Sequence, residues 1–206
     1  MLSQSVASAL REAISAGEFQ PGERLSEVKA AERFNCSRNT LRESFTRLAA
    51  ERIVERIPNR GVFLAMPDAD YIRDLFAARA AIEPAAVRWG AFADAPSLVT
   101  LTSSAFDYAA RGEHQEVSAI NQRFHRTLVA ALGSPTLNEQ MDNLLARMRL
   151  TFLLAIPRYP QLHADHIQGN ITLATLIADG KRDEAATLAH DSLMNTCEKI
   201  LAVLDD

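Results

Sequence analysis

The sequence predicts a mainly α protein: an N-terminal winged helix-turn-helix with a small β-hairpin wing, followed by an all-α antiparallel helical bundle. Apolar residues recur at helical spacing through most of the chain, and β-prone runs are confined to one short stretch around residue 60. The segment Met66-Pro67-Asp68 interrupts the pattern between the two parts. We therefore expect two domains, at residues 1–66 and 67–206.

The N-terminal part contains three predicted helices. Apolar residues between Leu2 and Ile14 recur at helical spacing and indicate a first helix that ends at Gly17. Ser26 is a suitable N-cap for a second, short helix, and Ser37 for a third, because a serine side chain accepts a hydrogen bond from a backbone N–H of the first turn. The second and third helices, joined by a short turn, predict a helix-turn-helix.

A predicted hairpin follows these helices. The runs 53–57 and 61–64 are rich in β-prone residues, and the turn formers Pro58, Asn59 and Gly61 surround Arg60. A hairpin with Arg at its tip completes a winged helix-turn-helix. In such a module one helix enters the major groove, and the wing lies on phosphates or in the minor groove.

The third helix has the chemistry for contact with DNA. Leu41, Phe45 and Leu48 recur at helical spacing and are expected to pack inward, which leaves polar residues on the other faces. Arg can pair with guanine, Asn with adenine, and Ser or Thr can hold a phosphate. The alternative is a solvated helix with ordinary surface charges. The candidate DNA-contacting residues of this helix and its cap are Ser37, Arg38, Asn39, Thr40, Arg42 and Arg47.

The second part has only helical signals. Pro84 lies inside the first of these helices and should kink it or mark a new start. Six helices of this length imply an antiparallel bundle. The expected ranges are about 75–91, 96–111, 114–132, 135–156, 161–179 and 183–204.

Composition narrows the classes of function. Residues 1–66 hold 10 Lys and Arg against 8 Asp and Glu, whereas the remainder holds 12 against 18, so only the first module suits phosphate contact. The two cysteines, Cys36 and Cys197, match no zinc or redox spacing. The chain shows no signal-peptide pattern and no apolar run that could cross a bilayer. We expect a soluble, cytoplasmic protein. No catalytic constellation is visible, so we expect no enzyme, with a metal-dependent helical enzyme as the alternative.

Several phrases resemble a known family. The phrases PGERLSE at 21–27, SRNTLRE at 37–43 and NRGV at 59–62 resemble the GntR family of bacterial transcription regulators. The helical remainder resembles its FCD subfamily, named for the C-terminal domain of the fatty-acid regulator FadR. The matching phrases there are RAAIE at 79–83, RFH at 123–125 and GKRDEAA at 180–186.

The resemblance implies a homodimer that binds a palindromic double-stranded DNA operator and responds to a small metabolite in the helical domain. It implies that Arg38 and Arg42 make the main contacts with DNA, supported by Ser37, Asn39 and Thr40. Arg24 stands beside Glu23, where some relatives place another DNA-contacting Arg, and is a candidate to replace it. The implied wing tip is formed by Asn59, Arg60 and Gly61.

Many members of the subfamily bind a divalent metal, often zinc, through one Asp and three His. The corresponding positions here are Asn121, His125, Asn170 and Ser192, so three of the four ligands are replaced. In one interpretation no metal is bound, and these residues form a polar cavity that hydrogen-bonds the effector. In the other, the register differs, and His166 or His190 completes a metal site with His125. A further alternative is that His125 is a buried histidine satisfied by a neighbour.

Two arginines are further candidates for the effector site. Arg79 and Arg149 lie among apolar residues, where an unpaired charge is costly. Arg79 can form an internal ion pair with Glu83, four residues on, or grip a carboxylate effector. The expected effector is a small organic or sugar acid. We expect a regulator that represses a metabolic operon, with activation as an alternative.

Overall fold

A computed structural model describes residues 2–205, apart from the side chains of Leu2, His163 and Asp205. The chain divides into two compact units. The first comprises the residues up to Asp68 together with Leu145–Leu154, and the second comprises Ala69–Leu144 and the residues from Ala155 onward. The boundary after Asp68 lies two residues beyond the one expected at 66/67, and the segment Leu145–Leu154 was not expected in the first unit.

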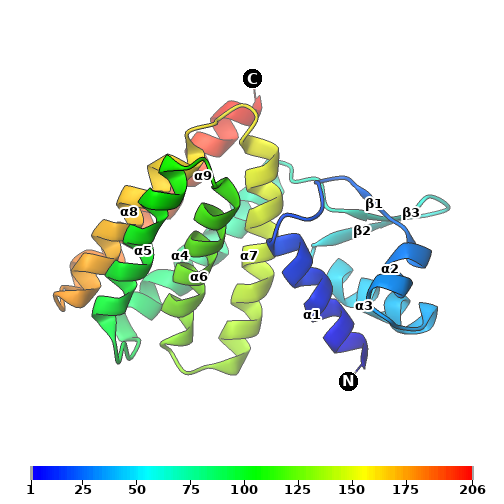
Figure 1. Ribbon diagram of the computed structural model, residues 1–206, viewed down its shortest axis with the longest axis horizontal. Coiled ribbons are helices and arrows are strands. Elements are labelled where there is room, and N and C mark those ends of the chain that lie inside the picture. The colour runs from blue at the N-terminus through cyan, green and yellow to red at the C-terminus, as the bar shows by residue number, and fades with distance from the viewer. Residues whose placement is uncertain (1, 206) are drawn as a thin grey trace. The chain divides into compact units, whose positions relative to one another are not determined.

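The first unit has the predicted order of three helices and a hairpin. Its three strands form an antiparallel sheet in the order β1-β3-β2. The sequence did not reveal β1, because two residues are too few to show a period-2 pattern. The elements are α1 (Leu2–Ser15), β1 (Arg24–Leu25), α2 (Glu27–Arg33), α3 (Arg38–Ala50), β2 (Val54–Ile57) and β3 (Gly61–Leu64) (Figure 1).

The core of this unit lies between α1 and α3. Leu10 and Ile14 of α1 are fully buried, as are Leu41, Phe45 and Leu48 of α3. Burying one such side chain stabilises a fold by about 1.5–3 kcal/mol. The inward face of α3 is therefore the one that the helical spacing predicted.

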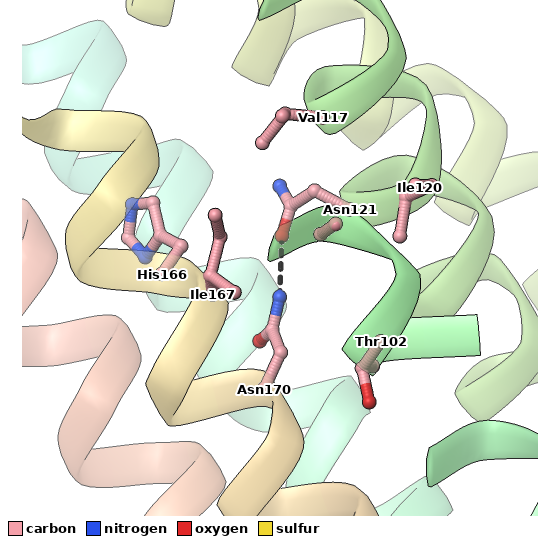
Figure 2. A pocket seen from close by; sticks show the side chains of 8 residues that line it. Thr102, Val117, Ile120, Asn121, His166, Ile167 and Asn170 are labelled. Atoms are coloured by element: carbon pink, nitrogen blue, oxygen red, sulfur yellow. Dashed lines mark hydrogen bonds between the residues drawn. The ribbon is translucent and has the colours of Figure 1, made fainter. Parts of the chain in front are cut away.

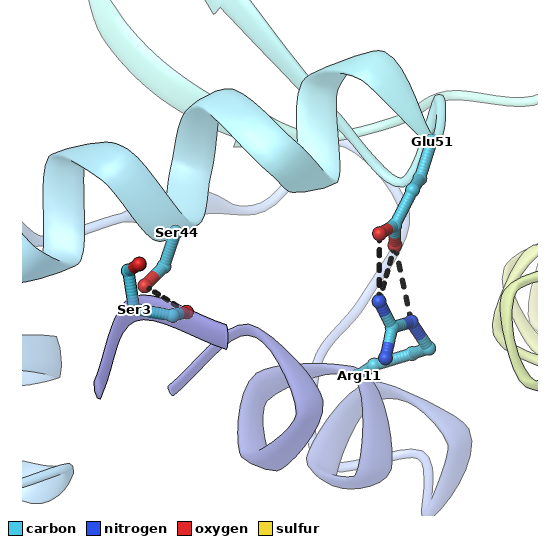
Figure 3. A network of polar contacts seen from close by, with 4 residues as sticks. All are labelled: Ser3, Arg11, Ser44 and Glu51. Carbon is cyan, nitrogen blue, oxygen red and sulfur yellow. Dashed lines mark hydrogen bonds and ion pairs between the residues drawn. The ribbon is translucent and has the colours of Figure 1, made fainter. Parts of the chain in front are cut away.

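Two polar links fix α3 against α1 (Figure 3). The guanidinium of Arg11 donates to the carboxylate of Glu51, with Nη2 2.7 Å from Oε1 and Nε 3.1 Å from Oε2. At the other end of the contact, the buried hydroxyl of Ser44 lies 2.8 Å from the backbone oxygen of Ser3. These links hold α3 at its middle and at its C-terminal end, and so restrict its rotation against α1.

Helices joined by short connections make up the described part of the second unit, which contains no strand (Figure 1). Within it α4 packs against α9, and α5 packs against α6 and α8. Val87, Phe124, Leu128, Leu173 and Ile177 are buried in one apolar cluster. The helices are α4 (Ala69–Trp89), α5 (Ala95–Ala110), α6 (His114–Ala130), α7 (Pro135–Ala155), α8 (Leu162–Ala178) and α9 (Arg182–Asp205), of which α7 contributes Leu145–Leu154 to the first unit.

Helix α4 differs from its prediction at two points. It begins at Ala69, well before residue 75, and Tyr71 and Ile72 extend its buried face in that direction. It also continues through Pro84, so this proline does not mark the start of a new helix. No helix in the described part of the chain is long and apolar enough to cross a membrane.

Candidate DNA-reading surface and effector cavity

The start of α3 is fixed by its cap. Ser37 has an extended backbone, with φ −69° and ψ 154°, and its hydroxyl accepts a hydrogen bond of 3.1 Å from the backbone N–H of Thr40. The hydroxyls of Ser37 and Thr40 also lie 2.9 Å apart. Arg38 and Asn39 follow the cap and are exposed. The first turn of α3 therefore presents a cation and an amide to solvent.

Arg42 lies one turn further along α3 and is exposed. Its Nε lies 3.1 Å and its Nη2 3.0 Å from Oε2 of Glu27, the first residue of α2. Arg56 of β2 donates a hydrogen bond of 3.2 Å to the backbone oxygen of Arg42. No role was predicted from the sequence for Glu27 or Arg56. Side chains alternate along a strand, so Arg56 lies on the same face of β2 as the buried Val54. This alternation could have indicated that Arg56 points toward α3.

Arg47 is also exposed but lies on another side of α3. At 3.6 residues per turn, Arg38 and Arg42 are only about 40° apart around the helix axis, whereas Arg47 is about 140° from Arg42. Arg38 and Arg42 can therefore face one surface of a partner together. Arg47 does not share that face.

The wing brings three of the expected residues together. Asn59 and Gly61 have φ of 60° and 112°, both in the left-handed half of the map, and Asn59, Arg60 and Gly61 are all exposed. Arg24 of β1 pairs in register with Phe63 of β3, and its Nε would lie 3.4 Å from a Cβ placed on Gly61. The structure thus places Arg24 at the wing.

In the second unit, two amides meet in a small cavity between α5, α6 and α8 (Figure 2). The side-chain N–H of Asn170 donates to the side-chain oxygen of Asn121 over 2.7 Å. The cavity has a volume of about 10 Å³, which is room for about one water molecule. An organic acid would therefore require the surrounding helices to move apart. The cavity is lined by Thr102, Ala105, Val117, Ile120, Asn121, His166, Ile167 and Asn170.

A buried ionic cluster joins α4 to α6. Nε of Arg79 donates to Oε1 of Glu83 over 2.6 Å, and both side chains are almost fully buried. Nδ1 of His125 lies 2.6 Å from Oε2 of the same carboxylate. Burial alone would raise the pKa of Glu83, but the charges of Arg79 and His125 and their hydrogen bonds outweigh it and lower that pKa to about 2. The internal ion pair expected for Arg79 is present, and His125 is a buried histidine with an internal partner.

Two expected effector residues do not join this region. Arg149 lies in the part of α7 that belongs to the first unit, with its guanidinium beside Gly17, and burial lowers its pKa. Ser192 is exposed on α9 and does not line the cavity. The sequence predicts that Ser192 lies on a helix, but not which way that helix turns this residue.

The residues present do not fit the metal site of the subfamily. The amides of Asn121 and Asn170 are bonded to each other, and neutral amides are poor ligands for a transition metal. Of the two alternative ligands, His190 is exposed, and its Nδ1 lies 3.0 Å from Oδ1 of Asp191. Within the described residues, no group of three or more His, Cys, Asp or Glu could hold a metal ion.

Both parts of the chain match known protein families. Residues 2–64 match the family of bacterial regulatory proteins called the gntR family, and residues 74–195 match the FCD domain. The Nta operon transcriptional regulator of Aminobacter aminovorans is 27% identical over 189 residues, which cover 90% of this chain and 88% of that protein. The galactonate operon transcriptional repressor of Escherichia coli (strain K12) is 28% identical over 160 residues, or 66% of this chain and 69% of that protein.

A solved structure agrees with this similarity. The crystal structure of a GntR transcriptional regulator from Rhodococcus sp. RHA1 superimposes with a TM-score of 0.82 at 29% identity, over 97% of both chains. The fold and these similarities define a regulator of transcription, not an enzyme, so the alternative of a metal-dependent enzyme is wrong. The chain belongs to the GntR family of bacterial regulatory proteins, with an FCD domain after the winged helix-turn-helix.

Proposed function

We propose that the chain is a repressor of a metabolic operon, released by a small carboxylate effector. In this proposal residues 1–66 bind a palindromic operator, and residues 67–206 bind the effector and form a homodimer. The single observation that carries the DNA-binding part is the exposed face that Arg38 and Arg42 share on α3. This helix is capped by Ser37, and its opposite face is buried. A regulator that dimerises through its second domain presents two such faces, which is why a palindrome is expected.

The proposed contacts with DNA come from two elements, helix α3 with its cap and the wing. Arg38, Asn39 and Arg42 of α3 read base edges. The hydroxyl of Ser37, which caps the helix, and that of Thr40 approach phosphate. The wing supplies Arg24 and Arg60, with Asn59 and Gly61 forming its turn. Arg47 contributes a sequence-independent charge from another side of the helix.

Selection from a pool of random duplexes tests the DNA-binding part. The wild-type chain is expected to enrich a palindromic sequence and to bind it with a salt-dependent affinity. Arg38→Ala and Arg42→Ala should each weaken binding to that duplex by at least about fivefold, since a base-reading Arg contributes about 1–3 kcal/mol of discrimination. A wild-type chain that enriches no sequence at any salt concentration would overturn the proposal. A reporter gene behind the selected sequence separates repression from activation by the sign of the change.

The effector proposal rests on Asn121 and Asn170. In this pair Asn121 keeps both N–H bonds of its amide, and Asn170 keeps one N–H bond and its oxygen, so donors and an acceptor remain for a polyhydroxy acid. Arg79 and His125 already share the carboxylate of Glu83, so we place them behind the site and not on the effector. The relative named for the galactonate operon supports a sugar acid as the class of effector.

Binding of sugar acids and of a simple dicarboxylic acid to purified protein tests the effector part. Galactonate, gluconate and succinate should be compared by calorimetry, with Asn121→Ala and Asn170→Ala as variants. We expect one of these acids to bind the wild type and to release it from the selected duplex, and both variants to lose that response. Ser192→Ala is the matched control, since this residue is exposed and should leave binding unchanged.

A further inference from the structure

Glu27 is an acid that lies among arginines of the surface proposed to face DNA. It is the first residue of α2, directly after the cap residue Ser26. A hydrogen bond from Arg42 lowers the pKa of Glu27, and the positive charges of Arg42, Arg38 and Arg56 lower it further. Its carboxylate is therefore ionised wherever the protein would meet DNA, and it repels phosphate.

The contact restrains the guanidinium of Arg42. Nε lies 3.2 Å from Oε1 and 3.1 Å from Oε2 of Glu27, and Nη2 lies 3.0 Å from Oε2. A guanidinium has five N–H bonds, and this edge-on contact uses two of them. The remaining three belong to Nη1 and Nη2, at the far end of the side chain, where they are available to an outside acceptor.

A second contact holds the backbone at the same position. Arg56 of β2 donates a hydrogen bond of 3.2 Å to the backbone oxygen of Arg42. The residue is thus restrained by α2 on its side chain and by β2 on its backbone. A cation held in this way loses less conformational freedom on binding than a free arginine does.

We propose that Glu27 is a positioning residue for DNA recognition: it holds Arg42 so that the free N–H groups of its guanidinium meet the acceptors of a single base, and its charge weakens binding to phosphates of any sequence. The inference rests on the proposed function, in which this face of α3 reads DNA. The acceptor chemistry that suits two N–H groups at one end of an Arg is the O6 and N7 pair of guanine.

If Glu27 served only to stabilise the fold, Glu27→Gln would lower the melting temperature and leave the discrimination between DNA sequences unchanged. Exposed ion pairs contribute little to folding, so Glu27→Gln should leave the melting temperature nearly unchanged. A change in discrimination between DNA sequences without a change in folding therefore separates positioning from a merely structural contact.

The test compares Glu27→Gln with Glu32→Gln, which removes the same charge from the same helix. The affinity of each full-length chain is measured by fluorescence anisotropy on the selected duplex and on a scrambled duplex, over a series of salt concentrations. We expect Glu27→Gln to bind the scrambled duplex more tightly than wild type does. It should also lower the ratio of specific to non-specific affinity by at least about fivefold, while Glu32→Gln changes that ratio by less than about twofold.

A double-mutant comparison makes the test specific to Arg42. In an Arg42→Ala background, Glu27→Gln should no longer lower the ratio, because the side chain that it positions is gone. If Glu27→Gln matched Glu32→Gln, or lowered the ratio equally without Arg42, the role of Glu27 would be refuted while the proposed function stood. A wild-type chain without any preferred duplex would instead overturn the proposed function, and this role with it.

Discussion

The carboxylate of Glu83 lies 2.6 Å from Nδ1 of His125, and the two residues are 42 positions apart in the sequence. Because a carboxylate can only accept hydrogen bonds, this ring nitrogen carries the proton. The one histidine retained from the metal-ligand pattern of the subfamily is thus tied to an internal acid that is also bonded to Arg79. The region that would hold a metal in relatives is organised here by side chains of the chain itself.

Removing the acid from this cluster should destabilise the fold. Glu83→Gln removes the carboxylate that faces the buried charge of Arg79, which should cost about 3 kcal/mol of unfolding free energy at pH 7. The folded-state pKa of Glu83 is about 2, below its ordinary value of 4.5. The stabilisation is therefore complete above pH 4.5 and is lost as the pH falls toward 2. Urea unfolding followed by circular dichroism between pH 7 and pH 3 measures this effect.

The pH series contains its own control. The difference between wild type and Glu83→Gln should narrow as the solution becomes more acidic, whereas Glu198→Gln, at an exposed glutamate of the same unit, should show no such trend. A difference that stays constant over the whole series would contradict the assignment of a lowered pKa to Glu83.

Restoring family ligands should restore affinity for zinc. Asn121 and Asn170 are in contact, and His125 lies one helical turn after Asn121 on the same face of α6. The double substitution Asn121→Asp with Asn170→His therefore brings a carboxylate and a second imidazole next to His125, which are ligands that zinc prefers. We expect the double variant to retain zinc after dialysis and the wild type to retain none. One tightly held zinc per wild-type chain, measured by elemental analysis, would contradict the conclusion that these residues do not fit a metal.

The arginines of α3 should fall into two functional groups. Arg38→Ala should weaken binding to the selected duplex far more than to a scrambled one, because Arg38 lies with Arg42 on the face proposed to read bases. Arg47→Ala should weaken both by similar factors and reduce the salt slope by up to about one unit. Anisotropy titrations at several salt concentrations distinguish the two patterns. Equal loss of discrimination in both variants would show that the face of α3 has been misassigned.

The link between α1 and α3 should contribute measurably to stability. Arg11→Met keeps the aliphatic contacts of the side chain but removes its hydrogen bonds to Glu51, which should cost about 1–2 kcal/mol of unfolding free energy. Glu12→Gln, at the neighbouring exposed position, is the matched control and should change it by less than about 0.5 kcal/mol. Urea titration of the full chain provides the values. Two variants of equal stability would show that the ion pair does not hold α3 in place.

Much of the first unit could be predicted because its signals are local. Ser26 and Ser37 cap the helices that they were expected to cap, since each cap bond spans only three residues. The buried face of α3 followed from the spacing of Leu41, Phe45 and Leu48. The pair Arg79–Glu83 in the second unit could be predicted for the same reason, because a separation of four residues along a helix brings two side chains onto one face.

The sequence by itself thus determined the helices, their caps, the wing and the family, because each depends on residues near one another in the chain or on phrases read in order. Only the tertiary structure decided which side chains meet across elements: Glu27 with Arg42, and Asn121 with Asn170. It also turned Ser192 outward. Helical spacing fixes where a residue lies on its own helix, whereas the rotation of that helix against its neighbours depends on how all the buried side chains pack together.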